Sequence, residues 1–136
     1  MAVYVTLCQG MSRADAVEAA TEELRALGKN HPNGPGALVE TLRLAMPNED
    51  GVAAIKPDII GEAACLSQLG SGSAGADTVL RAGQRAGSEV AATVIRAAQN
   101  FSFDDPREDP GNARKEPMAW LELLVEQGKA DDLGLL

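Results

Sequence analysis

The chain must build its core almost without aromatic side chains, and this limits the folds that are open to it. Its 136 residues are 45% hydrophobic, yet they include only two Phe, one Tyr and one Trp. The apolar residues are therefore mostly Ala, Leu, Val and Ile, which is the usual content of packed helices. A chain of this length suits one domain, or one small domain with a helical extension. We expect a mostly α fold.

The charge balance is acidic and argues against nucleic acids and membranes as partners. Twenty acidic and 12 basic residues give a formal net charge of −8. A surface that binds nucleic acid needs clustered Lys and Arg, but the densest basic pair, Arg114-Lys115, lies beside Glu108, Asp109 and Glu116. No apolar run is long enough for a membrane helix, and no basic segment precedes the short apolar stretch at the N-terminus. We therefore expect a cytoplasmic protein whose partner is another protein.

Apolar periodicity predicts helices through the first third of the chain. Residues 2–7 form a short apolar run that fits either a helix or a strand. Ser12 offers an N-cap for the segment that follows. Helical spacing of apolar residues then predicts helices over 13–27 and 37–44, separated by a loop at 29–36 that is rich in Pro, Gly and Asn.

A small β-hairpin is predicted after these helices. Residues 46–51 (MPNEDG) have turn composition and lie between two apolar runs. The second run, 52–55, is strand-like, and residues near 42–46 are its expected partner. Helices followed by a hairpin and a further helix are the order of a winged-helix module, which we assign to residues 1–69.

The next predicted helix begins directly after the hairpin and ends near residue 69. Pro57 suits the first helical turn, where its missing N–H is no loss, and the helix dipole favours a carboxylate at Asp58. Ile59, Ala63 and Leu66 share one apolar stripe, which we expect to face the core.

The C-terminal half is predicted to be a helical extension, residues 77–136, joined to the first module by a flexible connector at 70–76 (GSGSAGA). Two helices over 77–86 and 88–101 form a helical hairpin. A charged segment at 102–116, interrupted by two prolines, is expected to be mobile. A last helix begins at Pro117 and ends at Gly128.

The segment KPDIIGEA, which begins at Lys56, resembles a known family signature. It is similar to the PDLLGE-type motif that follows the ATPase core in bacterial STAND-type (NACHT/NB-ARC-like) P-loop NTPases. The resemblance implies a winged-helix-like and helical region that packs on the nucleotide domain and helps to hold its resting, ADP-bound state. In several branches a Met-His-Asp triplet lies at this junction. Lys56-Pro57-Asp58 is at the comparable place, and only Asp58 matches the triplet.

The sequence contains no recognisable catalytic constellation. It has no G-x-x-x-x-G-K-[ST] motif, so the ATPase core of the family is not present. His31 is the only histidine and lies in a loop. Cys8 and Cys65 lie in apolar helical patterns that indicate buried thiols, and the alternative is a single disulfide between them. We expect no enzyme activity, no cofactor and no metal site.

The candidate interface residues are Lys56, Asp58, Glu62 and Trp120. Lys56 and Asp58 are expected to face an ATPase core, although Asp58 also fits a purely stabilising role at the helix start. Trp120 lies on a Leu- and Val-rich stripe, where a tryptophan is more often a core or domain-contact residue than a platform for a ligand, and the stripe at 118–125 could instead meet a partner. The function predicted from the resemblance is a non-catalytic regulatory module of a STAND-type signalling ATPase. The alternative is a free-standing acidic inhibitor that binds a protein, either antitoxin-like or a nucleic-acid mimic.

Overall fold

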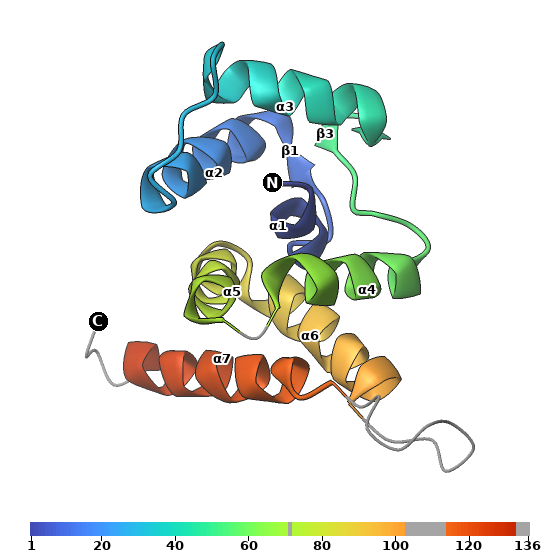
Figure 1. The fold of residues 1–136 in the computed structure, drawn as a ribbon, viewed down its shortest axis with the longest axis vertical. Helices are drawn as coiled ribbons and strands as arrows, with labels where there is room; N and C mark the ends of the chain where they lie inside the picture. The colour runs from blue at the N-terminus through green and yellow to red at the C-terminus, as the bar shows by residue number, and fades with distance from the viewer. Residues whose placement is uncertain (71, 103–113, 133–136) are drawn as a thin grey trace.

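The computed structural model describes residues 1–70, 72–102 and 114–132, and these residues form seven helices and a three-stranded antiparallel sheet (Figure 1). The mostly α fold with one small hairpin is confirmed. The charged segment predicted to be mobile lies largely outside the described residues. In chain order the elements are α1 (Ala2–Leu7), β1 (Met11–Ser12), α2 (Arg13–Ala26), α3 (Gly34–Ala45), β2 (Pro47–Asn48), β3 (Gly51–Val52), α4 (Asp58–Leu69), α5 (Ser73–Arg85), α6 (Gly87–Phe101) and α7 (Glu116–Asp132).

The sheet has the order β1-β3-β2, with two residues in each strand. The hairpin is present, but its first strand is Pro47–Asn48 and not the predicted 42–46, because α3 continues to Ala45. β1 was not predicted, since two residues are too few to produce a periodic pattern. Gly51 permits the contact between β1 and β3, because a Cβ there would lie 2.0 Å from the carbonyl oxygen of Met11.

The helix starts follow local chemistry. The predicted Ser12 cap is confirmed, since its hydroxyl accepts a hydrogen bond from the backbone N–H of Asp15. α3 begins at Gly34, three residues before the predicted start, with Pro35 in its first turn. α4 spans Asp58–Leu69, close to the predicted bounds, and Pro57 is its N-cap residue rather than part of its first turn.

The connector between the two halves is shorter than predicted, because α5 begins at Ser73. Residues 73–76 form the first turn of that helix. Gly75 is part of the reason, since a Cβ at this position would lie 2.1 Å from the carbonyl oxygen of Leu69. The absence of a side chain lets α5 turn back directly against the end of α4. The predicted helical hairpin is present as α5 and α6.

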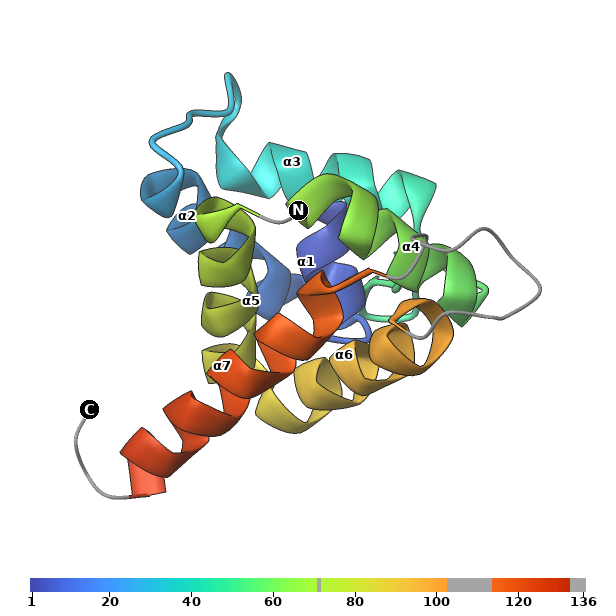
Figure 2. The same ribbon diagram turned by 60° about the horizontal axis from the view of Figure 1, so that its bottom comes forward.

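A single hydrophobic core passes through both halves of the chain. In Figure 1, α2, α3 and the sheet lie at one end and α4–α7 at the other, with α1 between them. α1 contacts α4, α5 and α6, and its residues Tyr4, Val5 and Leu7 are buried. Figure 2 shows α7 lying across α5 and α6, and Trp120 joins the same core. Among the described residues, no helix has the length and apolar content needed to cross a membrane.

Candidate functional site

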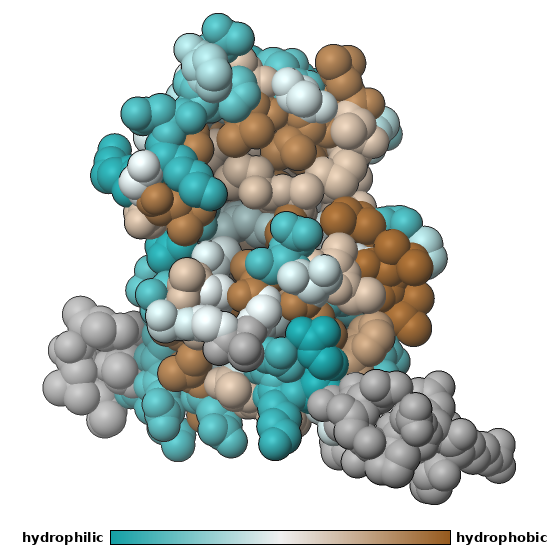
Figure 3. Space-filling model, viewed as in Figure 1, coloured by the Kyte–Doolittle hydropathy of each residue, from teal (hydrophilic) through white to brown (hydrophobic). Residues whose placement is uncertain are grey.

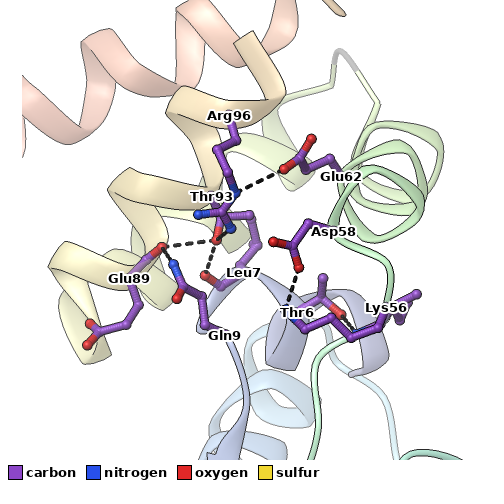
Figure 4. Close-up of polar contacts among 10 residues, drawn as sticks. Thr6, Leu7, Gln9, Lys56, Asp58, Glu62, Glu89, Thr93 and Arg96 are labelled. Carbon is purple, nitrogen blue, oxygen red and sulfur yellow. Dashed lines mark hydrogen bonds and ion pairs between the residues drawn. The ribbon is translucent and has the colours of Figure 1, made fainter. Parts of the chain in front are cut away.

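The segment that carries the family resemblance, residues 56–63, forms the end of the loop after β3 and the first half of α4. It lies against the C-terminal end of α1 and one side of α6, where side chains from all three regions meet (Figure 4). The loop is fixed to α1 by the Thr6 hydroxyl, which accepts a hydrogen bond of 3.1 Å from the backbone N–H of Ile55. Gly61 then lets α4 approach closely, since a Cβ there would lie 2.7 Å from the carbonyl oxygen of Ile55.

Glu62 is turned into the protein and is only 1% exposed. Its carboxylate accepts hydrogen bonds from Arg96 Nε at 3.1 Å and from Asn100 Nδ2 at 2.5 Å, both on α6. A buried carboxylate needs such charged and polar partners, because its desolvation is costly. The prediction of Glu62 as an interface residue is therefore wrong. Its side chain joins α4 to α6 inside the molecule.

Lys56 and Asp58 form an ion pair with each other at the surface. The hydrogen bond from the Lys56 ammonium lowers the pKa of the Asp58 carboxyl. The Asp58 side chain makes no hydrogen bond that caps α4. Of the two stabilising effects predicted for it, only the favourable interaction of its charge with the helix dipole remains. Both side chains are exposed, which is compatible with contact to a partner.

Two isoleucines beside this ion pair are exposed, although the sequence suggests a core position for one of them. Ile59 is 52% exposed and Ile60 is 54% exposed, while Leu66, two turns later, is only 1% exposed. The predicted stripe is therefore wrong at Ile59, because the first turn of α4 extends past the elements that cover its later turns. Figure 3 shows hydrophobic surface gathered over this end of α4. We call Lys56, Asp58, Ile59 and Ile60 the α4 face.

Trp120 does not belong to an exposed surface. It is 3% exposed and part of the hydrophobic core, where α7 meets α5 and α6. The interface role predicted for Trp120 is therefore replaced by the core role that its Leu- and Val-rich stripe also fits. The structure does not bring Trp120 together with the α4 face.

Several polar residues of this region were not recognised in the sequence. Thr93 on α6 donates its hydroxyl proton to either of two carbonyl oxygens, Leu7 at 3.1 Å and Glu89 at 3.0 Å. The Gln9 amide also donates to the Glu89 carbonyl, and Gln9 adopts a left-handed φ of 60°. Helical periodicity places Thr93 near the predicted buried face of α6. No local sequence pattern, however, predicts which carbonyl oxygen accepts its hydrogen bond.

The space between these polar side chains is small. The notch bordered by Thr6, Gln9, Lys56, Asp58 and Arg96 holds about 10 Å³, which is about the volume that one water needs. Cavities that hold small molecules are usually some 300–1,000 Å³. The arrangement therefore serves to position α4 against its neighbours and offers no room for a substrate.

Larger cavities lie elsewhere. A groove of about 410 Å³ lies between the start of α1, the end of α2 and the start of α5. Its only carboxylate, Glu23, is paired with Arg81 at 2.5 Å. Two further cavities, of about 380 and 220 Å³, border α7. None of the three cavities includes a residue of the α4 face.

Both cysteines are buried, as predicted, and they are free rather than joined by the alternative disulfide. Burial raises the pKa values of Cys8 and Cys65 to about 12, so both remain protonated at neutral pH. His31 lies in the α2–α3 loop, where its Nδ1 accepts a long hydrogen bond from the Asn33 backbone. Among the residues that the structure describes, no three His, Cys, Asp or Glu side chains are grouped so as to hold a metal ion.

Comparisons with known proteins found no family model, no curated protein and no solved structure that matches this chain.

Proposed function

We propose that this chain is a non-catalytic regulatory module that binds a protein through the α4 face, and that its partner is the P-loop ATPase core of a STAND-type signalling protein. The observation that carries the proposal is the exposure of Ile59 and Ile60, at 52% and 54%, beside the charged residues Lys56 and Asp58. An apolar centre with a charged rim is the usual anatomy of a protein interface. The same four residues lie in the segment that resembles the family signature.

The order of elements supports a winged-helix-like assignment for residues 1–69. A helix, a strand, two helices and a hairpin follow one another, and the second hairpin strand lies between the other two strands. In the family that the sequence resembles, such a module would contact the ATPase core. The proposal includes a cytoplasmic location, which the two free cysteines support.

Direct binding of nucleic acid is not part of the proposal. Most arginines already pair with carboxylates of this chain, namely Arg13, Arg43, Arg81, Arg85, Arg96 and Arg114. Paired guanidinium groups attract phosphates weakly, because their charge is already neutralised. The net charge of −8 instead favours the alternative function, an acidic inhibitor that binds a basic protein.

The DNA upstream of the Met1 codon distinguishes these functions. The proposal predicts an in-frame segment that encodes a strand, a G-x-x-x-x-G-K-[ST] loop and a helix. A stop codon followed by a ribosome-binding site contradicts the proposal and favours the acidic inhibitor.

A binding experiment tests the α4 face directly. We expect the double substitution Ile59→Ser/Ile60→Ser to weaken binding to the purified ATPase core at least about tenfold, because exposed apolar side chains at an interface centre carry much of the affinity. Val125→Ser is the matched control, since Val125 is 49% exposed on α7, and it should leave binding unchanged. Equal loss in both variants, or no loss in either, contradicts the assignment of the α4 face.

A further inference from the structure

The loop between α2 and α3 contains the only Asn-Gly pair in the chain, Asn33-Gly34. Of the five asparagines, the other four precede residues that carry a side chain. The amide carbon of an asparagine side chain can be attacked by the backbone nitrogen of the next residue, and this closes a five-membered imide ring. A glycine at that next position favours the attack, because no Cβ lies beside the nitrogen. The pair is therefore a candidate site of chemical modification.

The Asn33 side chain does not take the capping role that its position suggests. Asn33 is the N-cap residue of α3, where asparagine usually accepts a hydrogen bond from a backbone N–H of the first helical turn. Here its side chain makes no such bond, and the residue is exposed to solvent. Figure 1 shows the loop at the end of the molecule away from α7. Water and hydroxide therefore reach the Asn33 amide.

The backbone nitrogen of Gly34 is held only at the very start of α3. Its N–H donates to the His31 carbonyl oxygen at 3.0 Å, and the first four N–H groups of a helix have no partner in the helical ladder. Gly34 has a φ of +80°, and a Cβ there would meet no atom within 4 Å, so its surroundings are not crowded. Helix ends fray at little cost in free energy. Release of this nitrogen therefore requires the opening of the first turn alone.

We propose that Asn33 is a site of spontaneous deamidation through a succinimide. The Gly34 backbone nitrogen loses its proton to the solvent and attacks Cγ of Asn33, which forms a new C–N bond, and the side-chain nitrogen takes up a proton and leaves as ammonia. Water then adds to one of the two carbonyl carbons of the ring and breaks the bond from that carbon to the ring nitrogen. The product is aspartate or isoaspartate. Nothing is oxidised or reduced, water is the only reactant consumed, and the site is independent of the α4 face.

The two products affect the start of α3 differently. α3 has no acidic residue in its first turn, and the helix dipole favours the negative charge that either product places there. Isoaspartate also adds a methylene group to the backbone, which moves the loop relative to the first turn. This start matters for packing, because α3 lies against α2 and its Val39 is buried. Both products therefore change the charge at the start of α3, and isoaspartate alone lengthens the backbone there.

Peptide mapping of the native protein by mass spectrometry tests the proposal. After incubation in mildly alkaline buffer, we expect the peptide that contains Asn33 to gain the mass difference between an amide and an acid, and to separate into two peptides of equal mass. Two such products identify the succinimide, since direct hydrolysis of the amide gives aspartate alone. Asn48 is the internal control, because it is also exposed and its Oδ1 accepts a 2.8 Å hydrogen bond from the N–H of Glu49, which carries a side chain. An unchanged Asn33 peptide, a single product, or an equally fast change at Asn48 would overturn the proposal.

Three substitutions test the role of each group in the reaction. Asn33→Ser removes the amide but keeps a side chain that suits an N-cap, and it should abolish the mass gain. Gly34→Ala should slow the mass gain at least about tenfold, because a Cβ hinders the nitrogen and a φ of +80° is unfavourable for alanine. Gly36→Ala, at an open position inside α3, is the matched control and should leave the rate unchanged. Equal rates in the two alanine variants would contradict the attack by the Gly34 nitrogen.

The rate in the folded protein tests the structural part of the proposal. Opening of the first turn of α3 costs little free energy, so we expect the native protein to deamidate at Asn33 within about tenfold of its rate in guanidinium chloride. A larger difference would show that the folded start of α3 protects Asn33, and the proposal would be wrong.

Discussion

At the residue scale, we expect the buried Glu62 to contribute more to the free energy of unfolding than the exposed charged residues around it. Its carboxylate is 1% exposed and depends on Arg96 and Asn100 for compensation. We expect Glu62→Gln to lower the free energy of unfolding by about 1.5–3 kcal/mol, because it keeps the side-chain volume but removes hydrogen bonds to a charged group. Urea denaturation measures the difference. Glu49→Gln, at an exposed position of the hairpin, should change stability by less than about 0.5 kcal/mol. Similar effects at the two positions would show that the Glu62 contacts contribute little.

The two thiols permit a second prediction at the same scale. The pKa values of Cys8 and Cys65 are raised to about 12 by burial, so at pH 8 the reactive thiolate is far rarer in the folded state than in the unfolded state. We expect a thiol-specific reagent at pH 8 to label the native protein at least about a thousandfold more slowly than the protein in denaturant. Rapid labelling of either cysteine in the native protein would contradict its buried placement.

At the element scale, glycines decide how closely α4 can pack. A Cβ on Gly61 would lie 2.7 Å from the Ile55 carbonyl oxygen and 2.9 Å from Thr6 Cγ2, whereas a Cβ on Gly36 in α3 would meet no atom within 4 Å. We therefore expect the same glycine-to-alanine substitution to have opposite effects on stability at these two positions. Gly61→Ala should cost about 1–3 kcal/mol despite its better helix propensity, and Gly36→Ala should stabilise by up to about 1 kcal/mol. Thermal unfolding of the two variants compares them, and a stabilised Gly61→Ala protein would show that α4 is not packed this closely.

At the scale of the whole molecule, the two halves share one core and several polar contacts. Arg85 on α5 pairs with Glu22 at 2.8 Å and with Glu18 at 3.4 Å, both on α2, and the Tyr4 hydroxyl donates to the Arg81 carbonyl. The core cluster also unites residues of α1 and α2 with residues of α5 and α6. Residues 1–69 alone therefore lack α5 and α6, which cover part of α1 in the whole chain.

The consequence is a prediction about fragments. We expect a fragment of residues 1–69 to lack fixed tertiary structure, because its apolar α1 side chains would be exposed on the side that α5 and α6 cover. A fragment of residues 1–102 should stay folded, since it loses only α7 among the described helices. Amide NMR spectra distinguish folded from unfolded fragments. A dispersed spectrum from residues 1–69 would show that the winged-helix-like module folds alone.

Much of the fold could be predicted from interactions between residues that are close together in the sequence. The Ser12 cap and the start of α4 after Pro57 each depend on neighbouring residues and are present, while the turn predicted at 46–51 is confined to residues 49–50 between β2 and β3. Their physical basis is short range, since a cap or a turn is stabilised within four or five residues of chain. The aliphatic composition likewise determined the mostly α fold, because such residues pack well as helices.

Only the tertiary structure decided which side chains are inside. Helical periodicity places Ile59 and Leu66 on one stripe, but the elements that cover α4 reach only its later turns, so Ile59 is exposed. Glu62 is buried because Arg96, 34 residues later, lies opposite it. Likewise β1 exists because it pairs with β3, Met11 with Val52 and Ser12 with Gly51, and the absence of a side chain at Gly51 permits the approach. Burial and pairing depend on residues far apart in the chain, and a local pattern carries no information about which of them will meet.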